Sequence, residues 1–167
     1  IFNERMNIAE DALVYRVERT KEATPANAPI LYQYGAFVHR LGKEESVDQL
    51  FKNRRATVSL GYIGLYEVAT VFFGNNWENN PEAKEFTLDI IRDMKHRVEE
   101  WSDQYGYHFS IYSTPSESLT DRFCRLDTEK FGSIPDITDK EYYTNSFHYD
   151  VRKNPTPFEK LDFEKVY

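Results

Sequence analysis

The feature that most constrains the fold is a long amphipathic helix predicted near the middle of the chain. Pro81 suits its first turn, because proline lacks only an N–H that would have no intrahelical partner there. The residues that follow place one stripe on a single helical face: Thr87, Ile90, Ile91, Met94, Val98 and Trp101. Gly106 ends the pattern. Residues from Pro81 to Gly106 are therefore predicted to form a helix with one buried face.

Strand patterns flank this helix. Residues 56–60 are mostly β-branched or apolar and precede the Gly61–Gly64 turn, after which residues 65–73 are predicted to form a buried helix. Residues 107–113 alternate between two faces, as a half-buried strand does. A chain that mixes such strands with helices is predicted to have an α/β (or α+β) fold.

The remaining elements are predicted from weaker patterns. Apolar residues at three- and four-residue steps predict a helix over 3–23, and Ser46 is expected to cap a short helix ending near Phe51. Strands are predicted at 28–34 and 144–151, and residues 155–167 are expected to be an irregular, aromatic tail that needs a partner surface.

Length and charge exclude several classes of function. The 167 residues suffice for a single domain. The net charge of −7 repels nucleic-acid backbones and anionic lipid headgroups, so neither is expected as a partner. Aromatic residues make up 16% of the chain, which favours a folded protein over a disordered one.

The single cysteine, Cys124, rules out an intrachain disulfide and a cysteine-based zinc finger, and fits a reducing, cytoplasmic compartment. No apolar run approaches the roughly 20 residues that a membrane span needs, and no signal-peptide pattern is present. The sequence begins with Ile1 and stops directly after a segment that is expected to be structured. We therefore expect a piece of a longer polypeptide.

The segment most suggestive of chemistry joins the strand at 107–113 to the next helix. Thr114, Pro115 and Glu117 have the spacing of a capping box with proline in the first helical position, and Leu119, Phe123 and either Leu126 or Cys124 are expected to face inward. A helix start rich in hydroxyl groups can hold an anion through free N–H groups. The alternative is a capped helix without a ligand.

Other motifs point less clearly to chemistry. The Gly61–Gly64 turn lacks a third glycine and the Lys-Ser/Thr pair of a phosphate-binding P-loop. His148 and Asp150 share one face of a predicted strand, but no third metal ligand is near in sequence, so no metal site is predicted. Arg122 and Arg125 flank Cys124 and could lower the pKa of an exposed thiol, although a buried structural cysteine is favoured.

Four segments closely resemble the anaerobic (class III) ribonucleoside-triphosphate reductases. They are RATVSLGYIGL at 55–65, FSIYSTPSES at 109–118, DRFCRLD at 121–127 and YYTNSFH at 142–148. The segments occur in the family's order, and the similarity extends over all 167 residues. The resemblance implies a ten-stranded α/β barrel like that of other ribonucleotide reductases and of pyruvate formate-lyase. It also implies that residues 1–167 are one fragment of the second half of this catalytic barrel domain.

The resemblance implies an oxidoreductase that converts ribonucleoside triphosphates to deoxyribonucleotides for DNA synthesis. In such a glycyl radical enzyme, a glycine near the C-terminus passes the radical to a cysteine, and the thiyl abstracts the 3′-hydrogen of the ribose. A structural zinc, nucleotide effectors, a radical S-adenosylmethionine activating enzyme and a homodimer also belong to the complete protein. Neither Cys124 nor any glycine here matches the catalytic positions, so the fragment is expected to bind none of these cofactors and to be inactive alone.

The resemblance also assigns a substrate site. Six residues are expected to form the loop that holds the substrate phosphates: Ser113, Thr114, Pro115, Ser116, Glu117 and Ser118. Tyr112 is expected to line the ribose side of the pocket. The alternative is a non-catalytic structural or interaction module, in which the loop merely caps a helix and the tail at 158–167 docks on a neighbouring domain or subunit.

Overall fold

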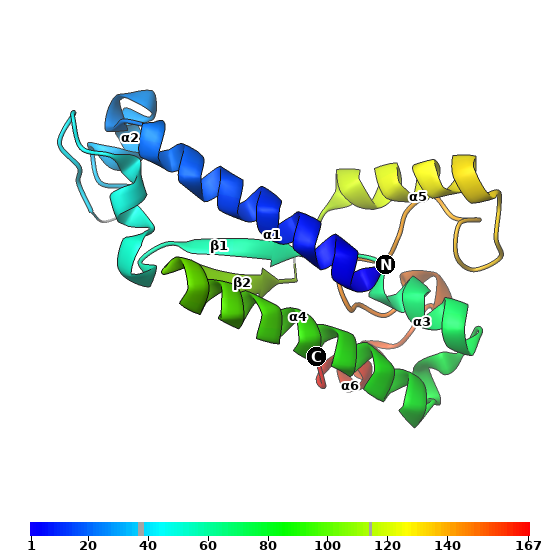
Figure 1. Cartoon of the computed structure of the whole chain (residues 1–167). Coiled ribbons are helices and arrows are strands. Elements are labelled where there is room, and N and C mark those ends of the chain that lie inside the picture. The colour runs from blue at the N-terminus through cyan, green and yellow to red at the C-terminus, as the bar shows by residue number, and fades with distance from the viewer. Residues whose placement is uncertain (37–38, 114) are drawn as a thin grey trace. The chain divides into compact units, whose positions relative to one another are not determined.

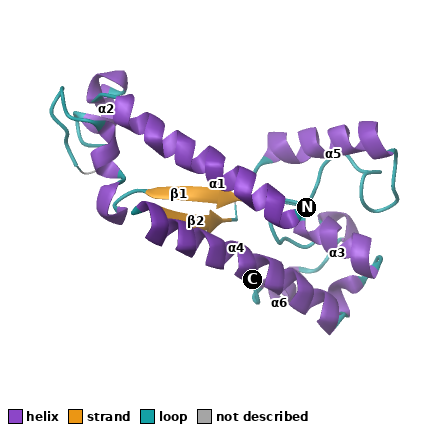
Figure 2. Cartoon of the chain, viewed as in Figure 1, coloured by secondary structure: helices purple, strands orange, loops and turns teal. Residues whose placement is uncertain are grey.

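The computed structural model describes residues 1–36, 39–113 and 115–167 (Figures 1 and 2). The helices and strands are α1 (Phe2–Glu18), α2 (Pro29–Tyr32), β1 (Thr57–Gly61), α3 (Leu65–Phe73), α4 (Pro81–Tyr105), β2 (His108–Tyr112), α5 (Glu117–Phe131) and α6 (Pro157–Glu164). Short 3₁₀ helices lie at Arg19–Glu22, Pro25–Asn27, Val47–Leu50, Lys52–Arg54, Trp77–Asn79 and Val151–Lys153. The chain divides into two compact units, one of Ile1–Leu60 with Met94–Ile111 and one of Gly61–Asp93 with Tyr112–Tyr167. None of the helices in the described ranges is long and apolar enough to cross a bilayer.

The first unit contains a two-stranded parallel sheet. Strands β1 and β2 are hydrogen-bonded neighbours and run in the same direction (Figure 1). Phe109 of β2 is buried and packs edge-on against Trp101 of α4, with ring centroids 6.1 Å apart. Arg97 on α4 donates hydrogen bonds to Asn3 and Asn7 of α1, each at 3.1 Å. These contacts join α1 and the last turns of α4 to the strand core.

An aromatic core fills the second unit. Tyr66 of α3, Trp77 and Phe163 of α6 are each at most 3% exposed, and the ring centroids of Trp77 and Phe163 lie 5.5 Å apart. The expectation of an irregular tail was wrong at this point. Pro157 occupies the first turn of α6 and Thr156 forms a capping box with the residue three positions on, which are strong signals for a helix start. The tail aromatics find part of their partner surface within the chain.

The other well-patterned elements are confirmed. The helices at Leu65–Phe73 and Pro81–Tyr105 and the strands at Thr57–Gly61 and His108–Tyr112 lie within a residue or two of their expected bounds. The helix expected at 3–23 is α1, continued by a 3₁₀ turn. Ser46 accepts a hydrogen bond from the Asp48 N–H at 3.4 Å and so caps the expected short helix, which is a 3₁₀ helix.

Two predicted strands were wrong. Residues 28–34 contain the short helix α2, which Pro29 begins, because proline in the first turn favours helix over a paired strand. Residues 144–151 form a loop with one antiparallel bridge, between Asn145 and Ile63, and a 3₁₀ turn from Val151. Hydrogen bonds from this loop to other segments replace the ladder that the alternating pattern predicted.

The predicted inner face of α5 was also partly wrong. Cys124 is fully buried, as one alternative predicted, and Thr120 beside it is 2% exposed. Leu119, Phe123 and Leu126 are instead 41–43% exposed. Apolar periodicity identifies a face that favours burial, but it does not say whether the covering surface lies within the same 167 residues.

Candidate functional site

The proposed phosphate loop runs from the end of β2 to the start of α5 and is tied down at two points. The Ser113 hydroxyl lies 3.1 Å from the Tyr62 hydroxyl. The Ser116 N–H donates a hydrogen bond of 2.8 Å to Oδ1 of Asn145. Thr114, between these two attachment points, lies outside the described residues. The loop is therefore held from the turn after β1 and from the segment around Asn145.

The start of α5 differs from the predicted capping box. The helix begins at Glu117 with Ser116 as its N-cap, so Glu117 occupies the first helical position instead of the third, and Pro115 precedes the helix. The Ser116 hydroxyl makes no capping hydrogen bond with the described part of the chain. The Leu119 N–H donates to the Ser116 carbonyl at 3.1 Å, so the first-turn N–H groups without an intrahelical acceptor are those of Glu117 and Ser118. They remain available to an external acceptor such as a phosphate oxygen.

The Gly61–Gly64 turn lies against the same segment as the loop. Gly64 has a φ of 75°, a left-handed conformation that glycine adopts without strain. Its N–H donates to the Thr144 carbonyl at 2.8 Å, and Ile63 forms the bridge with Asn145. Burial raises the pKa of the Tyr62 hydroxyl, and the hydrogen bond with Ser113 opposes this rise. The turn therefore holds the loop in place. Nothing in its geometry indicates that the turn itself binds phosphate as a P-loop does.

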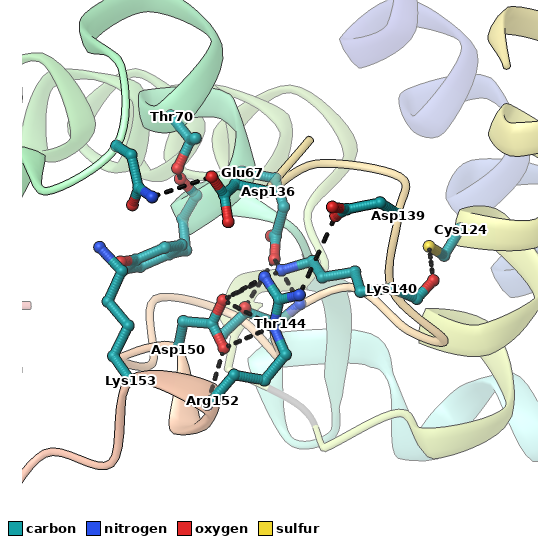
Figure 3. A network of polar contacts seen from close by, with 12 residues as sticks. Glu67, Thr70, Cys124, Asp136, Asp139, Lys140, Thr144, Asp150, Arg152 and Lys153 are labelled. Atoms are coloured by element: carbon teal, nitrogen blue, oxygen red, sulfur yellow. Dashed lines mark hydrogen bonds and ion pairs between the residues drawn. The ribbon is translucent and has the colours of Figure 1, made fainter. Parts of the chain in front are cut away.

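A buried ionic network supports the segment that precedes Asn145 (Figure 3). Glu67 Oε1 accepts hydrogen bonds from Lys140 Nζ, from the Thr144 N–H at 3.0 Å and from the Thr144 hydroxyl at 2.6 Å. Lys140 Nζ also lies 3.4 Å from Asp150 Oδ2, and the side chains of Glu67, Lys140 and Asp150 are each only 4–5% exposed. Such desolvated charges require their partners, so the network holds Thr144 firmly.

Arg152 completes the network at its exposed side. Its guanidinium donates to Asp150 Oδ2 at 2.9 Å, as Figure 3 shows. Burial by itself raises the pKa of Asp150, but the hydrogen bonds from Arg152 and the charge of Lys140 outweigh it, so the pKa lies below its usual value. Arg152 also lies 4.0 Å from Asp139 Oδ1, so its guanidinium joins a second carboxylate to the network.

Tyr112 is the last residue of β2 and adjoins the loop directly. Its side chain is 54% exposed, so it is accessible to a ligand bound at the loop. The assignment to the ribose side of a pocket stays a prediction.

The structure places the remaining candidates away from reactive chemistry. Cys124 is buried with its Sγ 2.9 Å from the Lys140 carbonyl, and burial raises the pKa of its thiol. His148 Nδ1 pairs with Glu164 at 3.0 Å, whereas Asp150 joins the ionic network, so these two residues do not converge as a ligand pair. Within the described ranges, no three His, Cys, Asp or Glu side chains are grouped as a metal site.

Three residues that matter most to the site geometry were not among the sequence candidates: Glu67, Lys140 and Asn145. A carboxylate within the apolar run at 65–73 was a usable signal, because a charge on a buried helix needs a partner. Nothing in the local pattern identified Lys140 as that partner, since 73 residues separate the two. Asn145 was assigned to a strand, where its side-chain bond to Ser116 could not be foreseen.

Comparison with known proteins identifies the family. The family model described as anaerobic ribonucleoside-triphosphate reductase matches residues 1–167. The chain belongs to this family. Curated relatives include the anaerobic ribonucleoside-triphosphate reductases of Escherichia coli K12 (45% identical over 168 residues), Haemophilus influenzae (48% over 166) and phage T4 (45% over 167). These matches cover 99–100% of this chain but only 24–26% of each relative, so the chain spans about a quarter of their length.

A solved structure shows the fold. The crystal structure of the anaerobic ribonucleotide reductase from Thermotoga maritima, with glycerol in its active site, matches with a TM-score of 0.73 at 18% identity. The match covers 100% of this chain and 25% of that one. The family resemblance and the mixed α/β fold class are thereby confirmed, and the elements are consistent with part of the reductase barrel.

Proposed function

We propose that this chain forms part of an anaerobic ribonucleoside-triphosphate reductase of the cytoplasm. The complete enzyme reduces ribonucleoside triphosphates to deoxyribonucleotides for DNA synthesis. In this proposal residues 1–167 supply scaffold of the catalytic barrel, and Ser113–Ser118 contribute part of the substrate phosphate site, with Tyr112 beside the ribose. Membership of the family supports the reaction, and the start of α5 supports the site.

The observation that carries the site assignment is the uncapped start of α5. Ser116 is the N-cap residue, but its hydroxyl accepts no capping hydrogen bond from the first-turn N–H groups that the structure describes. The N–H of Ser116 itself is already bonded to Asn145. The helix dipole alone contributes about 0.3–1 kcal/mol to anion binding. The N–H groups and the hydroxyls of Ser113, Ser116 and Ser118 therefore provide most of the expected phosphate affinity.

The radical and metal chemistry is assigned to other parts of the enzyme. Cys124, the only cysteine, is fully buried and bonded to a backbone carbonyl, so these residues do not fit a zinc-thiolate site or a surface thiyl. We place the glycyl radical, the structural zinc, the effector sites and the contacts with the activating enzyme and a second subunit outside this chain. The role of this chain is then to bind and orient the triphosphate.

The test is steady-state kinetics of the complete reductase with Ser116→Asp. A carboxylate at the loop repels the triphosphate, and we expect KM for the ribonucleotide to rise by about tenfold or more. Ser133→Asp is the matched control, because it adds the same charge at an exposed position just after the other end of α5. Equal KM values for the two variants would show that the loop only begins a helix, as the structural-module alternative states.

A further inference from the structure

We propose that Asn145 is a positioning residue for the triphosphate. It acts indirectly, by accepting a hydrogen bond from the Ser116 N–H and so fixing the phosphate loop. This inference rests on the proposed function of Ser113–Ser118. The hydrogen bond from Ser116 N to Asn145 Oδ1 is 2.8 Å long and partly buried. A backbone N–H can only donate, so the Asn145 amide must present its oxygen to the loop.

Asn145 itself is held on both sides by backbone contacts. Its bridge with Ile63 joins it to the turn after β1. The Gly64 N–H donates to the Thr144 carbonyl at 2.8 Å, and the Leu65 N–H donates to the Ser146 carbonyl at 3.3 Å. The residue therefore sits in a segment whose backbone is fixed against the start of α3, and its side chain spans from there to the loop.

The buried network makes this segment a rigid support. Glu67 fixes Thr144, the neighbour of Asn145, through both the N–H and the hydroxyl of that threonine. The adjoining Tyr143 N–H donates to the Thr120 carbonyl at 3.2 Å, which links the same segment to the first turns of α5. The Ser116 carbonyl accepts hydrogen bonds from the Leu119 and Thr120 N–H groups, which join the N-cap residue to its helix, and the Asn145 side chain joins the Ser116 N–H to this fixed segment.

The consequence concerns which N–H groups face the ligand. At this helix start the N–H groups of Glu117 and Ser118 have no intrahelical acceptor, whereas the Leu119 N–H donates to the Ser116 carbonyl. Because Asn145 accepts the hydrogen bond from the Ser116 N–H, the N-cap backbone is held at its φ of −132° and ψ of 69°, with the N–H groups of Glu117 and Ser118 directed to phosphate. Without that acceptor the loop would sample other orientations. The free-energy cost of ordering the loop would then reduce the affinity for the triphosphate.

The experiment compares Asn145→Ala with Asn79→Ala in the complete reductase. Asn79 is an exposed asparagine of the same unit and serves as the control. Loss of one partly buried hydrogen bond is expected to raise KM for the ribonucleoside triphosphate about three- to tenfold, with kcat changed by less than about twofold. The inhibition constant of tripolyphosphate is expected to rise by the same factor, since it reports phosphate binding alone.

Hydrogen exchange tests the structural step separately. A peptide covering Ser113–Ser118 should exchange faster in Asn145→Ala than in the wild type, whereas Asn145→Asp keeps an oxygen acceptor and should retain slow exchange. Should Asn145→Ala fail to fold, Asn145→Gln displaces the acceptor by one methylene and is expected to raise KM and loop exchange by smaller amounts. Unchanged KM or unchanged loop exchange in a folded Ala or Gln variant would overturn the inference.

The two proposals fail in different ways. If Ser116→Asp raises KM and Asn145→Ala does not, the phosphate site stands and Asn145 does not position it. If neither variant changes KM while Asn145→Ala still loosens the loop, the phosphate assignment itself is wrong.

Discussion

Removing the charge of Glu67 should strongly destabilise the second unit. Glu67→Gln retains an oxygen for Thr144 but leaves the buried Lys140 ammonium without its nearest counter-charge. Breaking one side of a buried ion pair costs about 3–5 kcal/mol. Asp150 remains 3.4 Å from Lys140 Nζ, so we expect the lower end of the range, about 3 kcal/mol. With a urea m-value of about 2 kcal/mol/M, the unfolding midpoint should fall by about 1.5 M.

The assay is urea unfolding followed by tryptophan fluorescence. In a Trp101→Phe background, the buried Trp77 is the sole tryptophan and reports on the second unit. Glu129→Gln is the matched control, because its carboxylate is 60% exposed and pairs with Arg125 at 3.0 Å, and it should cost less than about 0.5 kcal/mol. A Glu67→Gln midpoint equal to that of the Glu129→Gln control would refute the reasoning about the buried network.

Three further predictions concern other parts of the second unit. Phe163→Ala should lower the free energy of unfolding by about 3–5 kcal/mol in the same assay. Phe158→Ala, at a residue that is 83% exposed, should change it little. Equal losses of stability in the two variants would count against the aromatic core. Cys124 should react with a thiol reagent far more slowly in the native chain than in urea, because burial raises its pKa, and rapid native labelling would argue otherwise. The lowered pKa of Asp150 stabilises the fold at pH values above the unfolded-state pKa of about 3.9, and this stability is lost as pH falls through the native pKa. Asp150→Asn should therefore make the free energy of unfolding fall less steeply in acid. An unchanged dependence of the free energy of unfolding on pH would contradict this.

Much of the fold was predictable where periodicity and end signals agree. The helix α4 combines a proline start, an apolar stripe and a glycine stop, and its bounds follow from these local signals. The strands β1 and β2 are likewise set by β-branched content or alternation. By contrast, residues 144–151 alternate like a strand but have no ladder partner beyond one bridge, and only the tertiary contacts decide this.

The site was predictable in its location but not in its support. The hydroxyl-rich sequence and the family resemblance both indicated Ser113–Ser118, and the structure shows a helix start within that segment. Its helix begins two residues later than the capping-box spacing predicted, and the Ser116 N–H is bonded to Asn145, which is distant in sequence. Long-range bonds of this kind, including the one between Glu67 and Lys140, leave no mark in local sequence patterns.

A crystal structure of the complete reductase with a bound ribonucleoside triphosphate would locate the phosphates directly. We expect phosphate oxygens within about 2.7–3.2 Å of the first-turn amide nitrogens of α5, with the Ser116 N–H still bonded to Asn145. Phosphates bound elsewhere in the enzyme, with only water at the start of α5, would contradict the proposed role of this segment.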